Sequence, residues 1–192
     1  MIWSRGFRPS WPYLAGDGTK KQKGFSLIEL LIVVTIILII AAIAIPNLLR
    51  AKMAANEASA VGSLRTITTA QATYSSMYSV GYARTLAALG SPAAGLPTNT
   101  CTQAGLIDPV LTGGNKSGYN FADFAGITAN GTVPAAIPPG CADGAAAWTL
   151  APVPVTCDTT GHRTFFLDQT GVIRFSAAAA CPAATVASAP LQ

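Results

Sequence analysis

Residues 20–50 read KKQKGFSLIELLIVVTIILIIAAIAIPNLLR and place a single acidic residue, Glu29, in an otherwise uncharged apolar run over residues 25–49. As a helix rising about 1.5 Å per residue, this run spans roughly 37 Å, which exceeds the ~30 Å hydrocarbon core of a bilayer. It is therefore long enough to cross a membrane. A carboxylate inside such a segment costs roughly 2.5 to 3.5 kcal/mol at the centre and less near an end. Glu29 is therefore expected to have a cationic partner.

The residues before the run indicate the source of that cation. The first 24 residues hold five basic side chains and one acidic one, and no apolar stretch long enough for the core of an ordinary secretory signal peptide. Cleavage between Gly24 and Phe25 would create a new α-amine four residues before Glu29, which is one helical turn away. A positive amine at a helix N-terminus opposes the macrodipole, whereas a carboxylate in the first turn favours it. The Phe25 amine is thus the expected cation.

The stretch KGFSLIEL (residues 23–30), followed by the apolar run and Pro46, resembles the prepilin cleavage and methylation motif of type IV pilins and type II secretion pseudopilins. In that family a membrane aspartic peptidase cuts after the glycine and N-methylates the new first residue. The family glutamate neutralises the amine of a neighbouring subunit during filament assembly. The resemblance implies these roles for Gly24, Phe25 and Glu29. Pro46 stands where the family's transmembrane helix has its proline, whose ring and missing N–H loosen a helix locally.

The charge pattern fits an exported protein with a removable leader. The net charge of +4 is accounted for entirely by residues 1–24, which leaves seven basic and seven acidic side chains in the rest of the chain. The basic pI is therefore no argument for nucleic-acid binding. Lysines and arginines before the apolar run predict a cytoplasmic N-terminus, with residues 50–192 on the opposite side of the membrane.

The four cysteines all lie in the part expected to be exported, where disulfides persist. They are Cys101, Cys141, Cys157 and Cys181. Two bridges are expected, and the sequence leaves all three connectivities open. A metal site is a weaker interpretation, because there is no C-x-x-C pair and the chain has one histidine.

After Pro46 the pattern remains helical but becomes amphipathic, with apolar residues recurring at intervals of three, four and seven. These residues are Met53, Ala60, Leu64, Ile67, Tyr74 and Tyr78. The pattern predicts one helix from residue 25 to about 77, roughly 80 Å long, whose second half packs on a domain. The expected organisation is a removed leader (1–24), a transmembrane and filament-core half of the helix (25–49), an amphipathic half (50–80) and a globular head (81–192).

The sequence of the head predicts a connecting region followed by strands. Residues 81–116 are rich in Gly, Pro, Ala and Thr, with short helical or irregular pieces near 85–89 and 106–111. Strands are predicted at 118–125, 146–155 and 163–176, the last a hairpin in which Asp168 opens a type I turn and Gly171 closes it. Pro152 and Pro154 restrict the middle segment to an edge or an early break. The expected fold class is α+β and pilin-like: a long N-terminal helix packed on a small antiparallel sheet of about four strands, with a disulfide-stapled C-terminal region.

Nothing in the sequence predicts an enzyme or a bound cofactor. His162 lies in a turn before a strand and has no Ser or Cys partner at a suggestive spacing. Asp158 and Asp168 could contribute to a calcium site, but the six to eight oxygen ligands that calcium takes are not visible, and Asp168 is explained by the hairpin. No metal site is therefore predicted.

Taken with the resemblance, these features predict a structural subunit of a type IV pilus-like filament that is made as a prepilin. The implied partners are further copies of the chain, a prepilin peptidase, the inner-membrane assembly machinery and, before assembly, membrane lipid. The implied location is the inner membrane and then an extracellular pilus. The alternatives are a pseudopilin of a periplasmic type II secretion pseudopilus and a processed anchor that does not assemble. An ordinary signal-anchored protein would have no reason to combine the glycine, the aromatic residue, the glutamate and the proline.

Overall fold

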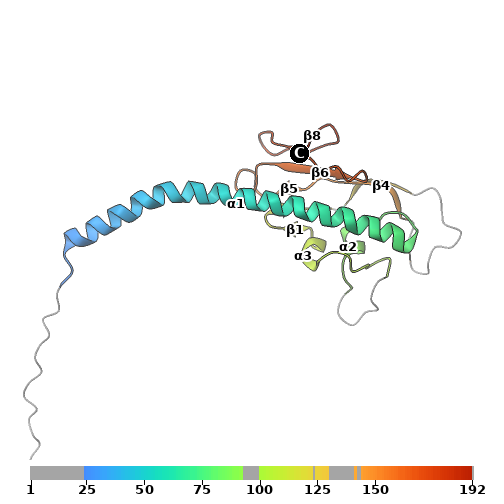
Figure 1. The fold of residues 1–192 in the computed structure, drawn as a ribbon, viewed down its shortest axis with the longest axis horizontal. Coiled ribbons are helices and arrows are strands. Elements are labelled where there is room, and N and C mark those ends of the chain that lie inside the picture. The colour runs from blue at the N-terminus through green and yellow to red at the C-terminus, as the bar shows by residue number, and fades with distance from the viewer. Residues whose placement is uncertain (1–23, 93–99, 123, 130–140, 142–143, 192) are drawn as a thin grey trace, which may run out of the picture. The chain divides into compact units, whose positions relative to one another are not determined.

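The computed structural model describes residues 24–92, 100–122, 124–129, 141 and 144–191. The chain divides into two compact units, Met1–Ile43 and Ala44–Gln192. The elements of the second unit surround the latter part of helix α1, with α2 and α3 on one side of it and β6 and β8 on another (Figure 1).

Helix α1 (Leu27–Tyr78) has 52 residues and continues through Pro46. At about 1.5 Å per residue it is roughly 78 Å long. The predicted helix is confirmed, with its end one residue later than expected. Termination follows from Ser79, which takes the left-handed conformation (φ 55°) that commonly ends a helix, and whose N–H still donates to the Ser75 carbonyl at 3.0 Å.

Two one-turn helices confirm the short helical pieces expected in the connecting region. Helix α2 (Leu86–Leu89) is capped by the Thr85 hydroxyl, which accepts from the Ala88 N–H. Helix α3 (Pro109–Thr112) is capped by Asp108, which accepts from the Leu111 N–H at 2.9 Å. Pro109 suits the first position of that helix because the N–H it lacks has no partner within a helix there.

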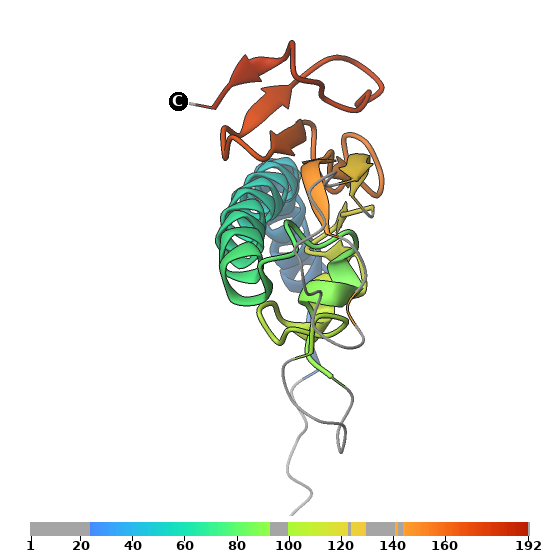
Figure 2. The same ribbon diagram turned by 90° about the vertical axis from the view of Figure 1, so that its right-hand side faces the viewer.

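The strands form two antiparallel sheets. The three-stranded sheet has the order β1 (Asn115–Lys116), β2 (Tyr119–Asn120) and β5 (Val153–Pro154). The five-stranded sheet has the order β3 (Ala125–Ala129), β4 (Ala145–Leu150), β6 (Thr164–Asp168), β7 (Arg174–Ser176) and β8 (Ala189–Pro190). In a view turned by 90°, the strands β6, β7 and β8 lie above the coil of α1 (Figure 2). The α+β fold class predicted from the sequence is confirmed.

The arrangement of strands differs from the prediction in detail. The expected strand 118–125 is split between β2 and the start of β3, which belong to different sheets. The expected strand 146–155 breaks at Pro152 into β4 and β5, as its prolines predicted, because a proline has no N–H for the ladder. The five-stranded sheet exceeds the expected four because β8, only two residues long, adds to the edge of β7.

The predicted hairpin between β6 and β7 is confirmed. Phe165 pairs with Phe175, and the turn is closed by the Gly171 N–H, which donates to the Asp168 carbonyl at 3.0 Å. Gly171 has a φ of 76°, a conformation that glycine adopts without steric cost. The Asp168 carboxylate accepts from the Thr170 N–H at 2.9 Å, so this side chain stabilises the turn between β6 and β7.

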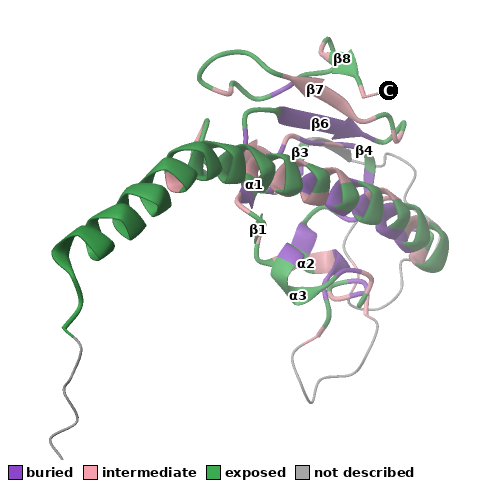
Figure 3. Cartoon of the chain, turned by 60° about the vertical axis from the view of Figure 1, so that its left-hand side comes forward, coloured by how far each residue is buried: buried purple, intermediate pink, exposed green. Residues whose placement is uncertain are grey.

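The core lies between α1 and the strands. One stripe of α1 is buried, while the opposite face and nearly all of the N-terminal half are exposed (Figure 3). Four of the six residues of the predicted stripe are buried and the other two, Met53 and Tyr78, are half-buried. The head contributes large buried side chains to the same core, among them Trp148, Tyr119 and Phe165.

Two disulfides join the four cysteines, as predicted, and resolve the connectivity that the sequence left open. The pairs are Cys101–Cys141 and Cys157–Cys181, with sequence separations of 40 and 24 residues. The second bridge closes a loop that contains β6 and β7 and ends in the C-terminal segment.

Replacing both Cys157 and Cys181 with alanine is expected to lower the free energy of unfolding of the head by about 3.5 kcal/mol, because the open chain regains loop entropy in its unfolded state. The Cys101 and Cys141 pair closes a longer loop and is expected to contribute about 4 kcal/mol. Denaturant unfolding of the detergent-solubilised chain, followed by tryptophan fluorescence, measures both values. Unchanged unfolding midpoints in both double variants would contradict the expectation.

Gln71 connects α1 to the segment that follows the end of this helix, at Ala83. Its side chain is 1 % exposed; its amide nitrogen donates to the Ala83 carbonyl at 3.0 Å, and its amide oxygen accepts from the Ala83 N–H at 2.7 Å. The side-chain amide therefore satisfies both backbone groups of Ala83, as a neighbouring strand would. Its position four residues after Ile67 and three before Tyr74 places it on the buried stripe.

Gln71→Leu keeps the approximate volume but leaves the N–H and carbonyl of Ala83 buried without partners, which is expected to cost about 3 kcal/mol of unfolding free energy. The same denaturation experiment measures this loss. Thr69→Val is the matched control, because the Thr69 hydroxyl is exposed and, within the described residues, donates to the Arg65 carbonyl of its own helix. A Gln71→Leu variant as stable as that control would show that the two bonds add nothing to stability.

Candidate processing and assembly segment

Gly24, Phe25 and Glu29, the residues that the sequence analysis assigns to processing and assembly, lie at or just before the start of α1. Gly24, Phe25 and Ser26 precede the helix, and its first turn is closed by the Leu30 N–H, which donates to the Ser26 carbonyl at 3.2 Å. Glu29 lies in that first turn. Its carboxylate is thus placed where the helix macrodipole favours a negative charge. Gly24, Phe25 and Glu29 are all exposed.

The apolar half of α1 is uncovered by the rest of the described chain. Its large side chains are exposed, with exposed fractions from 45 % for Val34 to 82 % for Leu27. An 18-residue window of the helix has a mean hydropathy of 3.2, and none of that window is buried within the chain. The segment is long and apolar enough to cross a membrane. Exposed apolar surface of this extent indicates contact with lipid or with other proteins.

One polar side chain of the apolar run, Thr35, is hydrogen-bonded within its own helix. The hydroxyl of Thr35 donates to the Leu31 carbonyl at 2.8 Å, so this side chain presents mainly its methyl group outward. Pro46 lies inside the continuous helix, where it removes one backbone N–H from the helical ladder. The proline thus falls near the point where the two compact units of the chain meet in sequence.

Comparison with known proteins gives matches to this same segment. Residues 19–45 match the model of the prokaryotic N-terminal methylation motif. The chain is also 60 % identical over 38 residues to the type IV wide pilus major component PilA4 of Thermus thermophilus. That alignment covers 20 % of this chain and 29 % of the relative. The N-terminal segment is therefore similar to that of a type IV pilin and carries the prokaryotic N-terminal methylation motif. No solved structure matches the chain significantly.

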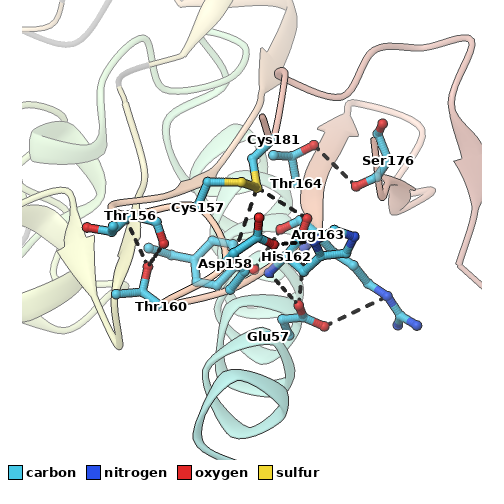
Figure 4. Close-up of polar contacts among 12 residues, drawn as sticks. Glu57, Thr156, Cys157, Asp158, Thr160, His162, Arg163, Thr164, Ser176 and Cys181 are labelled. Atoms are coloured by element: carbon cyan, nitrogen blue, oxygen red, sulfur yellow. Dashed lines mark hydrogen bonds and ion pairs between the residues drawn. A yellow bond between two sulfur atoms is a disulfide. The ribbon is translucent and has the colours of Figure 1, made fainter. Parts of the chain in front are cut away.

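Beyond the pilin-type segment, two side chains of α1 bind the loop before β6. Glu57 accepts from the N–H groups of His162 and Arg163 at 2.9 and 3.1 Å (Figure 4). The Asn56 amide donates to the Thr160 carbonyl at 2.8 Å. The Arg163 guanidinium also lies 3.8 Å from Glu57. All three hydrogen bonds enter the loop that the Cys157–Cys181 bridge closes.

Sequence reasoning did not identify this connection, which we call the α1 clamp (Asn56 and Glu57 with residues 160–163). The sequence does contain a feature that could have predicted the α1 clamp. Glu57 lies three residues before Ala60 and seven before Leu64, so it falls on the buried stripe of α1. A carboxylate on the apolar face of an amphipathic helix indicates a specific partner on the domain that the helix packs against. Its partners, more than a hundred residues later, have no local pattern that marks them.

The residues considered from the sequence for catalysis or metal binding lie in the head. His162 pairs through Nδ1 with Asp158, while Asp168 is engaged in the hairpin turn. Within the described ranges, no three His, Cys, Asp or Glu side chains are close enough to hold a metal ion.

Several charges of the head are compensated within it. The Lys116 ammonium lies 2.9 Å from Asp108. The hydrogen bond from Lys116, together with that from the Leu111 N–H, holds the pKa of the Asp108 carboxyl below its usual value. By contrast, the side chains of Arg50, Lys52 and Arg65 on α1 are exposed and contact no acidic group in the part of the chain that the structure describes.

Proposed function

We propose that this chain is the structural subunit of a type IV pilus-like filament. It is made as a prepilin, cleaved after Gly24, N-methylated at Phe25 and polymerised through the apolar half of α1. The observation that carries the proposal is the apolar surface between residues 27 and 49, which the described chain leaves uncovered and most of which lies within the matched N-terminal methylation motif. A filament whose subunits pack these helices together would bury that surface.

Assembly requires the Phe25 amine and the Glu29 carboxylate to find partners in an apolar medium. Before assembly, the helix is solvated by lipid and both groups lie near its cytoplasmic end. In a filament the amine of one subunit pairs with Glu29 of a neighbour. A wrong axial stagger would leave a charge unpaired, which is costly in a medium of low polarity, so the pair sets the register between subunits.

The proposal implies a sequence of locations and partners. The prepilin enters the inner membrane with its N-terminus in the cytoplasm, and a prepilin peptidase removes residues 1–24. Transfer from lipid to the filament exchanges one apolar environment for another, so the gain in apolar burial is small and the step needs an assembly motor.

The disulfide pattern favours a surface pilus over the pseudopilus of a type II secretion system. A C-terminal loop closed by cysteines is the feature expected of a pilin, and the Cys157–Cys181 bridge closes such a loop. The pseudopilus remains the alternative function for the same processed subunit.

The proposal is tested by the N-terminal sequence and intact mass of the chain in fibres sheared from the cell surface, compared with the membrane fraction. A methylated Phe25 start in long fibres would support the pilus. Processed chain confined to the cell envelope would support the pseudopilus or an unassembled anchor. A chain that begins at Met1 in every fraction would contradict processing.

A further inference from the structure

A short part of α1 lies between the apolar run and the first hydrogen bond from α1 to the head. Residues 50–52, 54 and 55 are exposed, Met53 is half-buried, and the α1 clamp begins at Asn56. This collar, residues 50–55, is therefore a turn and a half of helix between the apolar run and the first hydrogen bond to the head.

The collar carries two cations and no anion. Arg50 and Lys52 are exposed, and α1 has no carboxylate between Glu29 and Glu57. Glu57 is engaged by the amides of His162 and Arg163 and by the Arg163 guanidinium, so it is not available to neutralise the collar.

The position of the collar matches the headgroup layer of a membrane. A bilayer of about 40–45 Å with a hydrocarbon core of about 30 Å leaves roughly 5–7 Å of headgroups on each side, which about four helical residues span. If residues 25–49 fill the hydrocarbon core as a tilted helix, residues 50–53 lie at this depth on the side of the head.

We propose that Arg50 and Lys52 bind the phosphate groups of anionic phospholipids in the leaflet that faces the head. The inference rests on the membrane-inserted state of the proposed function. The two residues are separated by about 200° around the helix, so they contact different lipids rather than one. Arg50 can hold a phosphate through two parallel N–H donors, and the Lys52 stem can lie along the acyl chains while its ammonium reaches the surface.

The test measures lipid selectivity of the full chain reconstituted in vesicles of phosphatidylcholine and phosphatidylglycerol. Nitroxide-labelled forms of both lipids report, by electron spin resonance, the fraction of each that is immobilised at the protein. The double variant R50Q/K52Q is compared with the parent chain and with R65Q, which removes an exposed cation about 22 Å further along the same helix. The leader is identical in all three chains, so its cations contribute the same background.

We expect the preference for phosphatidylglycerol to fall roughly fivefold for each collar cation removed, and to fall with added salt in the parent. R65Q is expected to keep the parental preference. An equal preference in R50Q/K52Q and the parent would overturn the proposal, and so would a chain that immobilises neither lipid. Filament formation plays no part in this measurement, so its outcome is independent of the fibre experiment: a selective collar in a chain that forms no fibres would leave the inference intact and refute the proposed function.

Discussion

Gly24→Leu is expected to abolish cleavage and leave the chain at its full length. The reason lies in the peptidase, which in the prepilin family needs a small residue at this position. The chain's own fold does not require the glycine, since a Cβ built on Gly24 meets nothing within 4 Å and the backbone there is not left-handed. Intact mass of the chain, expressed with a prepilin peptidase, measures the effect.

Two controls separate peptidase recognition from a general effect of bulk. Gly24→Ala adds only a methyl group and is expected to be cleaved. Gly62→Leu makes the bulky change at a second glycine with open space around it and is also expected to be cleaved. Correct processing of Gly24→Leu would refute the role assigned to Gly24.

Glu29→Ala is expected to be processed normally but to polymerise poorly. The Phe25 amine of each subunit would then enter the filament core without an anion. Removing one partner of a buried ion pair costs roughly 3–5 kcal/mol, which corresponds to a fall of about a hundredfold or more in the equilibrium constant of each subunit contact. The yield of sheared fibres per processed subunit is the measurement.

Thr35→Val is the matched control for Glu29→Ala. It removes a polar group from the same apolar segment without changing the charge of that segment, and in the described part of the chain that hydroxyl donates to the Leu31 carbonyl of its own helix. Fibre yield should therefore be unchanged. Glu29→Gln is expected to fail as Glu29→Ala does, because the carboxamide has no charge to pair with the amine. A normal yield from Glu29→Ala would show that the carboxylate does not set the register.

Periodic and turn-forming features of this fold were predictable from the sequence. The buried stripe of α1 follows from apolar spacing, and the hairpin follows from Asp168 and Gly171 between two apolar segments. The break between β4 and β5 follows from Pro152. In each case the determining residues are close together in the chain, so local geometry alone predicts the element.

The features that could not be predicted depend on contacts between distant residues. The pairing of Cys101 with Cys141 depends on how the folded head brings the two together. The hydrogen-bond partners of Glu57 and Gln71 are backbone N–H and carbonyl groups, which almost any residue supplies, so the sequence does not mark them. Strands β1 and β8 have two residues each, too few to show a period. At the candidate assembly segment, the motif predicted Gly24, Phe25 and Glu29, whereas the collar was recognised only once the structure showed where the head begins.

The α1 clamp also determines how a subunit responds to mechanical force. Tension applied along α1 passes to the head first through the hydrogen bonds of Asn56 and Glu57, which all enter the loop closed by Cys157 and Cys181. A covalently closed loop cannot lengthen by unravelling from one end. We therefore expect the bridge to limit how far the loop that carries these three bonds can be drawn out when α1 is pulled.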